Sequence, residues 1–531
     1  MSNIKNPILS GFNPDPSIIR VEDYFYIATS TFEWFPGVQI HRSKDLKNWE
    51  LVSRALTNRS QLDMIGNPDS CGVWAPCLSY DNGTFYLVYT NVRSFDGVWK
   101  DTPNFLVTTT DILGEWSDPI YLSSHGFDGS LFHDDDGRKW FTSMLVDHRK
   151  GKFFGGIIMQ QFDQDVKRLV GPVHHIHQGT ELGKTEGPHL YKRKDYYYLL
   201  MAEGGTEYGH SISFARSKEL TGPYELHPQN PIISVKDSPS YPIQKSGHGD
   251  LVETKVGNVY MVFLIGRPLT DHGRCILGRE TAIEQMEWHV DDWLYPKAGT
   301  RVPRLEVSTD LEEFPVPISN TKDDFDSPHL DIQWQSLRRV FSEDWMSLKK
   351  RPGYLRLYGQ ESLSSFHYQS HIGRRLQHFH ASISTKLDFK PITFQQMAGL
   401  VIYYNTCHFH YLYMTSDENG RRLLNIITCD KYNMKEPISP VVVLGEDVVY
   451  LRAEINLGDL QFLYSVDEKK WINIGPILDL SILSDDYVRD EENRYRPAFT
   501  GTFVGLCCQD LSGQKVIADF DWFEYKGINQ S

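Results

Sequence analysis

Long hydrophobic segments are missing from this sequence. None of its 531 residues falls in a run that approaches the roughly 18 uncharged apolar residues of a membrane-spanning helix. The first seven residues, Met1 to Pro7, also lack the apolar core of a signal peptide. We therefore expect no membrane partner and a cytoplasmic location.

Cysteine is scarce and shows no metal-binding pattern. The seven cysteines are an odd number, and none of their spacings is typical of a zinc site. Cys71 and Cys77 are separated by five residues, and Cys507 is followed directly by Cys508. Reduced thiols are the simplest interpretation, and they agree with a cytoplasmic location.

Positive charge is in deficit as well, because 54 Lys and Arg residues face 69 Asp and Glu residues, for a net charge of −15. This balance disfavours nucleic acid and anionic membranes as partners, so a neutral ligand is the better expectation.

Long helical periodicity is absent from the sequence. Aromatic residues are abundant at 13% of the chain, and they favour half-buried strands, which predicts an all-β protein.

What the sequence does contain is a short aromatic strand pattern that recurs five times before residue 270. The pattern repeats every 55 to 62 residues, and its central rings are Tyr26, Tyr86, Phe141, Tyr198 and Tyr260. A β-rich repeat of this length is typical of a propeller, here with five blades.

A second set of residues keeps the same phase, 11 to 13 positions before each ring. Its members have side chains suited to an active site: Asp15, Trp74, Asp128, Glu186 and His248. Equivalent positions in a rotationally repeated fold face one axis. We therefore expect three acids, one indole and one imidazole to meet in one pocket.

The length of the chain favours more than one domain. We expect a catalytic propeller over residues 1–300 and a linker over 301–325, where Pro, Asp and Glu are frequent. Residues 326–531 predict a C-terminal β-sandwich, because strand-like segments alternate there with Gly, Asp and Asn turns.

The three acids fit the hydrolysis of a glycosidic bond with inversion. That reaction needs an ionised base to activate water and a protonated acid for the departing oxygen, about 6.5 to 9.5 Å apart. Asp15, held between two prolines, suits the base and Glu186 the acid. Asp128 would supply a negative charge that raises the pKa of Glu186 and would help to orient it.

Each of these residues also has an ordinary structural explanation. Asp15 and Asp128 precede Pro or Gly, as turn residues do, and Glu186 precedes Gly-Pro, as surface loop residues do. Their shared phase in the repeat, rather than any single motif, favours a common site.

Other candidates remain open in the same way. Trp74 is either a stacking wall for a sugar or core filler, and Phe32 either lines the opening or packs between blades. His248 either binds a substrate hydroxyl, water or a divalent cation such as calcium, or is a core histidine. Arg279 either binds sugar hydroxyls or lies on the surface.

Several motifs in the same order resemble those of family 43 glycoside hydrolases, specifically the two-domain β-xylosidases. They are Gly11-Phe-Asn-Pro-Asp-Pro-Ser17, the segment Thr29 to Ile40, Trp74-Ala-Pro76, Thr185-Glu-Gly-Pro-His-Leu190, Ala202-Glu-Gly-Gly-Thr206 and Leu277-Gly-Arg-Glu-Thr-Ala282. The resemblance is strong over residues 1–290 and looser beyond.

This resemblance implies a five-bladed β-propeller followed by a jelly-roll or lectin-like β-sandwich. It implies exo-acting release of terminal xylose from short β-1,4-xylo-oligosaccharides with inversion, no required cofactor, and a homo-oligomer. The matching positions are Asp15 for the base, Glu186 for the acid and Asp128 for the group that tunes it. Substrate-binding positions are matched by Phe32, Trp74, Thr206, His248, Arg279 and, from the second domain, Phe499.

Two other functions stay open at this point. The same carboxyl pair would serve an α-L-arabinofuranosidase, since any pentose that fits the pocket can be cleaved. A catalytically silent carbohydrate-binding propeller is the alternative outside the enzymes. The sequence also departs from similar enzymes in the short loop 269–276, and in Gly129, where a stiffer residue is expected.

Overall fold

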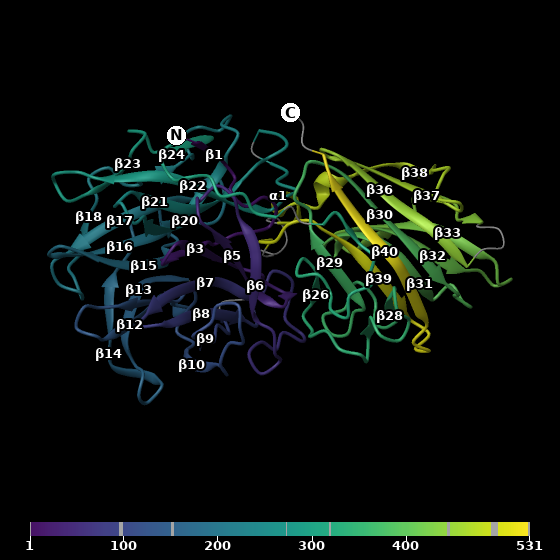
Figure 1. Cartoon of the computed structure of the whole chain (residues 1–531), viewed down its shortest axis with the longest axis horizontal. Coiled ribbons are helices and arrows are strands. Elements are labelled where there is room, and N and C mark those ends of the chain that lie inside the picture. The colour runs from purple at the N-terminus through teal and green to yellow at the C-terminus, as the bar shows by residue number, and fades with distance from the viewer. Residues whose placement is uncertain are drawn as a thin grey trace. The chain divides into compact units, whose positions relative to one another are not determined.

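The computed structural model describes residues 2–94, 99–149, 153–271, 273–317, 320–442, 447–489 and 498–528. The chain divides into two compact units. The first comprises Met1–His272 and Arg279–Pro317, and the second comprises Gly273–Gly278 and Ile318–Ser531. Figure 1 colours the strands of the first unit from purple to teal and those of the second from green to yellow.

The first unit consists of short antiparallel strands joined by tight turns (Figure 1). Its strands are β1 (Ser2–Lys5), β2 (Ser17–Val21), β3 (Tyr24–Thr29), β4 (Trp34–Phe35), β5 (Gly37–Ser43), β6 (Glu50–Leu56), β7 (Gly72–Asp81), β8 (Thr84–Val92), β9 (Asn104–Thr109), β10 (Ile120–Ser123), β11 (Ser130–His133), β12 (Lys139–Val146), β13 (Phe154–Asp163), β14 (Arg168–His177), β15 (Glu186–Arg193), β16 (Tyr196–Glu203), β17 (Ser211–Ser217), β18 (Glu225–Leu226), β19 (Ile233–Ser234), β20 (Gln244–Glu253), β21 (Val259–Gly266), β22 (Arg279–Trp288), β23 (Leu294–Pro296) and β24 (Glu306–Thr309).

All of these strands except β1, β4 and β24 form five consecutive sheets, which are the blades. Their strand orders are β2-β3-β5-β6, β7-β8-β9-β10, β11-β12-β13-β14, β15-β16-β17-β18 with β19 beside β17, and β20-β21-β22-β23. The first strands contact one another in a closed ring, β2 to β7 to β11 to β15 to β20 and back to β2. We call these five strands the inner ring, and their arrangement confirms the predicted five-bladed propeller.

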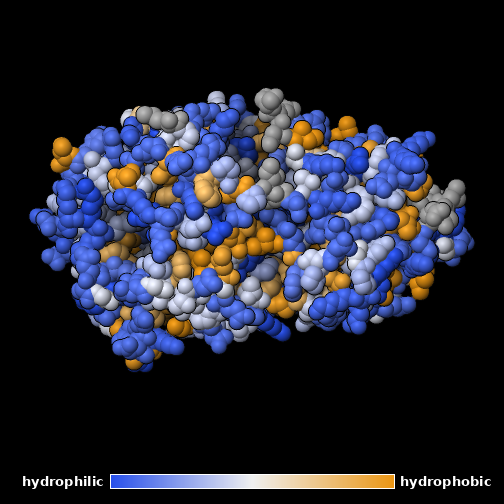
Figure 2. Space-filling view, viewed as in Figure 1, coloured by the Kyte–Doolittle hydropathy of each residue, from blue (hydrophilic) through white to orange (hydrophobic). Residues whose placement is uncertain are grey.

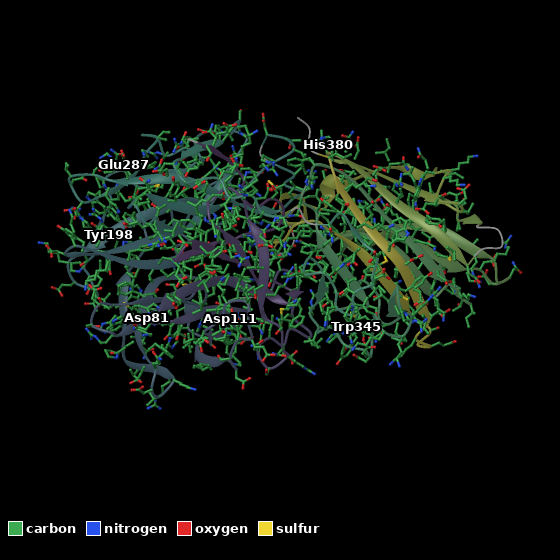
Figure 3. All side chains as sticks on the ribbon, viewed as in Figure 1. Asp81, Asp111, Tyr198, Glu287, Trp345 and His380 are labelled. Atoms are coloured by element: carbon green, nitrogen blue, oxygen red, sulfur yellow. The ribbon has the colours of Figure 1, made fainter. Side chains whose placement is uncertain are left out.

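The five aromatic residues of the repeat all lie on the second strand of a blade, and Tyr198 on β16 is labelled in Figure 3. Their rings help to fill the spaces between neighbouring blades. Tyr86 and Phe141 share a buried cluster of the second and third blades, Tyr198 lies in that of the fourth and fifth, and Tyr260 in that of the fifth and first. The aromatic residues therefore recur once per blade because each ring packs between neighbouring sheets.

The N-terminal strand of the chain joins the segment that follows the last blade. β1 pairs antiparallel with β24, so that Ser2 faces Thr309 and Lys5 faces Glu306. The following residues run along β22 of the last blade, where Leu9 forms an isolated bridge to Thr281. Because β24 lies within residues 301–325, part of the predicted linker is a strand of the first unit, and Pro317 is the last residue of that unit.

The second unit is a sandwich of two antiparallel sheets. Its elements are β25 (Lys322–Asp323), β26 (Gln335–Leu337), β27 (Met346–Ser347), β28 (Leu355–Tyr358), β29 (His371–Arg375), β30 (His380–Phe389), β31 (Gln396–Asn405), β32 (His408–Ser416), β33 (Arg422–Asp430), β34 (Asn433–Lys435), β35 (Val441–Val442), β36 (Val448–Asn456), β37 (Asp459–Ser465), β38 (Ile472–Asp479), the 3₁₀ turn η2 (Leu480–Ile482), the helix α1 (Asp485–Val488), β39 (Phe503–Asp510) and β40 (Ile517–Gly527).

One of these sheets has the order β27-β28-β40-β30-β36-β37-β38, with β25 beside β40. The other runs β34-β33-β32-β31-β39-β29-β26, with β35 beside β33. Contacts between β30 and β31 and between β28 and β39 join the two layers. The predicted C-terminal β-sandwich is thus confirmed.

Within the described part of the chain, no helix has both the length and the apolar character that crossing a membrane requires. Hydrophilic residues cover most of the face that Figure 2 shows.

Candidate active site

The three predicted acids come from the starts of three strands of the inner ring. Asp15 lies two residues before β2, Asp128 two residues before β11, and Glu186 is the first residue of β15. Trp74 lies near the start of β7 and His248 in the first half of β20. The charge of Asp15 raises the pKa of both other acids, which shows that the three carboxyl groups share one neighbourhood.

Asp15 is held by donors on both of its carboxylate oxygens. Ser30 Oγ donates to Oδ2 at 2.6 Å, and Arg279 Nη1 donates to Oδ1 at 3.0 Å. The side chain is 5% exposed, and its backbone has a φ of +52°. These contacts fix the direction of the carboxylate, as an acceptor of a proton from water requires.

Arg279 joins three predicted residues, Asp15 and Phe32 of the first blade and Thr206 of the fourth. Besides Asp15, its Nη1 donates to Thr206 Oγ1 at 3.1 Å, and its guanidinium carbon lies 5.3 Å from the centroid of the Phe32 ring. Arg279 is 4% exposed, so it is a buried residue of the site and not a surface arginine.

An aromatic wall lies beside this group. The ring of Phe32 is 5.7 Å from that of Phe12 and 6.0 Å from that of Trp74, and the Trp74 ring is 5.0 Å from that of Phe127. Trp74 donates its indole N–H to the carbonyl of Ser70 at 2.9 Å. Phe32 and Trp74 therefore belong to one aromatic surface, to which Phe12 and Phe127 add neighbours that the repeat pattern did not predict.

Glu186 is placed to keep its proton near neutral pH. Burial among protein atoms and the negative charge of Asp15 raise its pKa to about 8, against the opposing charges of Arg279 and Lys184. The side chain nevertheless keeps part of its surface open. A carboxyl group with these properties can donate a proton to a leaving group.

Asp128 lies next to the acid. Burial first, then the charges of Glu186 and Asp15, raise its pKa well above that of an ordinary aspartate. The backbone N–H of Gly187, the residue after Glu186, hydrogen-bonds to its carboxyl group. The largest causes of the raised Glu186 pKa are burial and Asp15, so the expectation that Asp128 tunes it remains a prediction.

His248 packs against the acid-bearing strand. A Cβ at Gly187 would lie 2.9 to 3.2 Å from three atoms of the His248 ring, and Gly187 has a φ of +56°, so only glycine suits this position. Burial is the largest cause that lowers the pKa of His248 to about 4. Its Nδ1 is 3.9 Å from Asp15 Oδ1. His248 is therefore a neutral imidazole beside the candidate base.

Two further acids hold the site without belonging to the predicted set. Glu203 accepts hydrogen bonds from Thr180, from Ser213 and from Thr185 Oγ1 at 2.8 Å, and so fixes the segment that leads to Glu186. Glu280 accepts from the Gly11 N–H at 2.8 Å and from Arg267, which fixes the segment that leads to Asp15. Both lie inside motifs already singled out in the sequence, and these motifs were the sequence signal that could have identified them.

Two predictions concern other parts of the chain. Phe499 belongs to the second unit and is 8% exposed, and its contact with substrate stays a prediction. Among the described residues, one group of three possible metal ligands is found within 4.8 Å, and it also lies in the second unit: Cys275, Asp485 and Asp486. A cation beside His248 stays a prediction.

Two family models match the chain. The one described as glycosyl hydrolases family 43 covers residues 4–294. The one described as the beta xylosidase C-terminal concanavalin A-like domain covers residues 322–526.

Similar proteins span nearly the full length. A protein named xylosidase/arabinosidase 43B from Humicola insolens is 48% identical, and the match covers 99% of this chain and 98% of that protein. A protein named beta-xylosidase from Bacillus subtilis is 46% identical, over 98% of this chain and 99% of that protein. The crystal structure of a xylan beta-1,4-xylosidase from Bacillus halodurans has a TM-score of 0.96 and 51% identity, and covers 98% of this chain and 100% of that chain.

Proposed function

Since the chain belongs to glycosyl hydrolase family 43 and is therefore a glycoside hydrolase, we propose that it releases terminal xylose from short β-1,4-xylo-oligosaccharides with inversion. The observation that carries this proposal is the group of three carboxyl side chains from three strands of the inner ring, with Asp15 acting electrostatically on both others. The names of the similar proteins, xylosidases in each case, support the choice of sugar.

In the proposed reaction Asp15 is the general base. A water molecule attacks the anomeric carbon and passes a proton to the carboxylate of Asp15. Ser30 and Arg279 support this role because they orient the carboxylate by donating to its two oxygens.

Glu186 is the general acid in this scheme. As the bond between the anomeric carbon and the leaving oxygen breaks, the oxygen takes the proton of Glu186, and the products are xylose of inverted configuration and a shortened oligosaccharide. A pKa of about 8 keeps this proton in place at neutral pH. Asp128 would orient the acid through Gly187, whose N–H it accepts.

The aromatic wall of Phe32 and Trp74 would stack on the CH face of the sugar. Arg279 and Thr206 would bind its hydroxyl groups. Binding of this kind suits a neutral pentose, which fits the chain's net charge of −15 better than a polyanion would.

The stereochemistry of the product tests the proposal directly. Proton NMR in the first minutes of hydrolysis of a nitrophenyl β-D-xyloside or of xylobiose is expected to show α-xylose before mutarotation. Initial formation of β-xylose would contradict the role of Asp15 as a base that activates water.

An arabinofuranosidase activity is the second candidate, and it is favoured by one observation: the relative from Humicola insolens is named for both activities. Comparing kcat/KM for nitrophenyl β-D-xyloside and nitrophenyl α-L-arabinofuranoside decides between them. We expect the xyloside to be preferred, and a clear preference for the arabinoside would reverse the assignment.

We also infer a cytoplasmic location and a homo-oligomeric state. The seven cysteines are all buried, and none of them forms a disulfide, which suits a reducing compartment. Light scattering of the purified protein tests the oligomeric state, and a monomeric mass would contradict it.

A calcium ion beside His248 is not needed for this chemistry. Calcium prefers about six to eight oxygen ligands, and the carboxylate oxygen that faces His248 Nδ1 is already bound by Arg279. This oxygen is therefore already used by a cationic side chain, and no step of the proposed reaction uses a metal ion.

A further inference from the structure

A fourth buried carboxylate, Asp250, lies on the propeller axis beyond the three acids. It follows His248 by two residues on β20 and is 5% exposed. It lines a cavity of about 430 Å³ whose walls come from the later residues of all five strands of the inner ring. The acids lie at the starts of these strands, so the Asp250 cavity lies at their other end.

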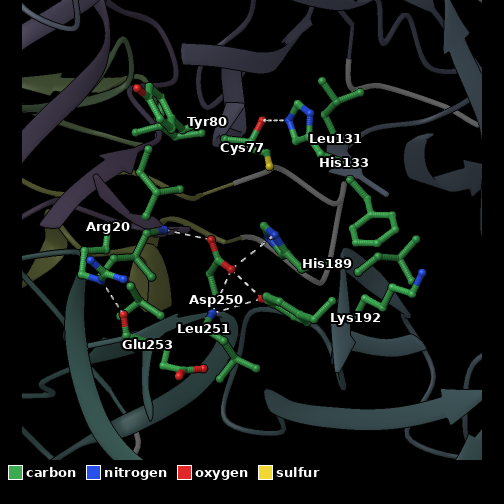
Figure 4. Close-up of a pocket in the computed structure, with 18 residues that line it drawn as sticks. Arg20, Cys77, Tyr80, Leu131, His133, His189, Lys192, Asp250, Leu251 and Glu253 are labelled. Carbon is green, nitrogen blue, oxygen red and sulfur yellow. Dashed lines mark hydrogen bonds and ion pairs between the residues drawn. The ribbon is translucent and has the colours of Figure 1, made fainter. Parts of the chain in front are cut away.

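Asp250 connects strands that belong to three blades. Figure 4 shows its carboxylate at the centre of the cavity wall. Oδ2 accepts hydrogen bonds from Ser17 Oγ at 2.9 Å and from the Ile18 N–H at 2.8 Å, both on β2. Oδ1 accepts from the hydroxyl of Tyr191 on β15 and from the Leu251 N–H at 2.8 Å.

Two further contacts add residues of β15 and β7 to this group of linked strands. The imidazole Nδ1 of His189, also on β15, lies 3.6 Å from Asp250 Oδ1. Ser17 Oγ in turn accepts the N–H of Leu78 on β7 at 3.0 Å. One carboxylate and one hydroxyl thus join the inner strands of four of the five blades.

The strands that Asp250 joins are those that carry the proposed base and acid. Ser17 follows Asp15 by two residues, and Tyr191 follows Glu186 by five residues on the same strand. Asp250 shares β20 with His248, whose ring packs against Gly187. A change in the length of these hydrogen bonds would therefore move the base relative to the acid.

A side chain with two acceptor oxygens is what this position requires. It offers about four acceptor sites on two oxygens, and four donors use them. The two backbone donors, from Ile18 and Leu251, point at different oxygens. In asparagine one of these oxygens becomes an NH₂ group, so either orientation would set an amide N–H against a backbone N–H.

We propose that Asp250 is a positioning residue that sets the separation of the Asp15 and Glu186 carboxyl groups by fixing β2 and β15 to β20. The proposal rests on the function proposed above, because it gives those two residues the roles of base and acid. Asp250 itself touches neither the sugar nor the reacting atoms.

The Asp250→Asn variant tests this role with a nitrophenyl β-D-xyloside. A displacement of about 1 Å between catalytic groups lowers rates by up to about 100-fold, so we expect kcat to fall about tenfold or more and KM to change less than about threefold. The basic limb of the pH profile should also move to lower pH, because a wider separation weakens the effect of the Asp15 charge on the pKa of Glu186.

Asp134→Asn is the matched control. Asp134 is also a buried carboxylate between blades, and it accepts hydrogen bonds from Lys192 and Tyr197, but it follows β11 at the end away from Asp128. We expect this variant to lose thermal stability while kcat and the pH limb stay within about twofold of the parent value, since general acid and base geometry is undisturbed.

Tyr191→Phe keeps the test valid if Asp250→Asn does not fold. It removes only the hydroxyl that donates to Asp250 and accepts the Leu251 N–H, and kcat is expected to fall about threefold. The positioning role would be overturned by folded variants at Asp250 or Tyr191 that lose thermal stability but keep the parent kcat and pH limb, or by an equal loss of kcat in Asp134→Asn. A parent enzyme that does not cleave the xyloside would instead overturn the proposed function, and this role with it.

Discussion

The two ends of the inner ring differ in how their polar groups are satisfied. At the starts of the strands, Asp15, Asp128 and Glu186 lie together and act on one another's charge. At the other end, Asp250 has a donor for every acceptor site. The two acids with raised pKa values therefore lie at one end, while Asp250 at the other end joins strands of neighbouring blades.

Left-handed backbone occurs at several residues around the starts of these strands. Asp15, Asp128, Gly187 and His248 have φ values of +52°, +56°, +56° and +50°, in the left-handed region. For residues other than glycine this conformation costs about 1 to 3 kcal/mol each. Asp15, Asp128 and His248 occupy the phase of the repeat from which the site was predicted, so three of the five blades have a left-handed residue at this position.

The largest expected effect comes from removing the base. Asn keeps the shape of Asp and tolerates a positive φ, so Asp15→Asn should preserve the fold and lower kcat about 10²- to 10⁴-fold. The measurement is kcat on a nitrophenyl β-D-xyloside, with circular dichroism as the control for folding. A loss of less than tenfold would show that Asp15 is not the base.

Removing the acid should depend on the leaving group. Glu186→Gln cannot protonate the departing oxygen, so kcat for xylobiose is expected to fall about 100-fold or more. An aryl xyloside with a good leaving group needs less protonation and should lose less activity. Equal losses on the two substrates would speak against Glu186 as the acid.

The pH profile provides a third test. Glu186 acts in its protonated form, and its pKa is raised to about 8. We therefore expect kcat/KM of the parent enzyme to fall above about pH 8, by about tenfold for each further pH unit. This limb should be missing in Glu186→Gln, and a limb that persists in that variant would belong to another group.

Gly187→Ala would sharpen the comparison at a single position. The added methyl group meets the His248 ring at 2.9 Å and the backbone has a positive φ, so the free energy of unfolding should fall by about 2 to 5 kcal/mol. Gly83→Ala is the control, because Gly83 also has a positive φ but no atom within 4 Å of the new methyl group. It should lose only about 1 to 2 kcal/mol. The measurement is the free energy of unfolding by chemical denaturation. Similar losses in the two variants would mean that the His248 ring moves aside at little energetic cost.

Chelation should have the smallest effect. Dialysis against EDTA is expected to change kcat by less than about twofold, because the carboxylate that faces His248 is already bound by Arg279. A larger loss that calcium restores would place a cation in the site after all.

The repeat made most of the fold and much of the site predictable. Because the blades are equivalent, a residue 11 to 13 positions before each ring had to face the axis. Asp15, Trp74, Asp128, Glu186 and His248 could therefore be grouped without knowing any contact. The β-sandwich followed from its alternating strands and turns.

Contacts between distant segments could not be predicted in this way. Asp250 meets Ser17 across 233 residues, and Glu280 meets Gly11 across 269. No local pattern marks such pairs, since a buried carboxylate looks the same in sequence as an exposed one. Gly129 is similar: a Cβ there would lie 2.6 Å from the Phe141 ring, which explains a glycine where a stiffer residue was expected.

The pairing of β1 with β24 has a practical consequence for handling the protein. The five blades are each made of consecutive strands, so none of them borrows a strand from the beginning of the chain. A purification tag or a short deletion at the N-terminus would therefore disturb the pairing of β1 with β24, which links the segments before the first blade and after the last one. Every blade would keep its full set of strands.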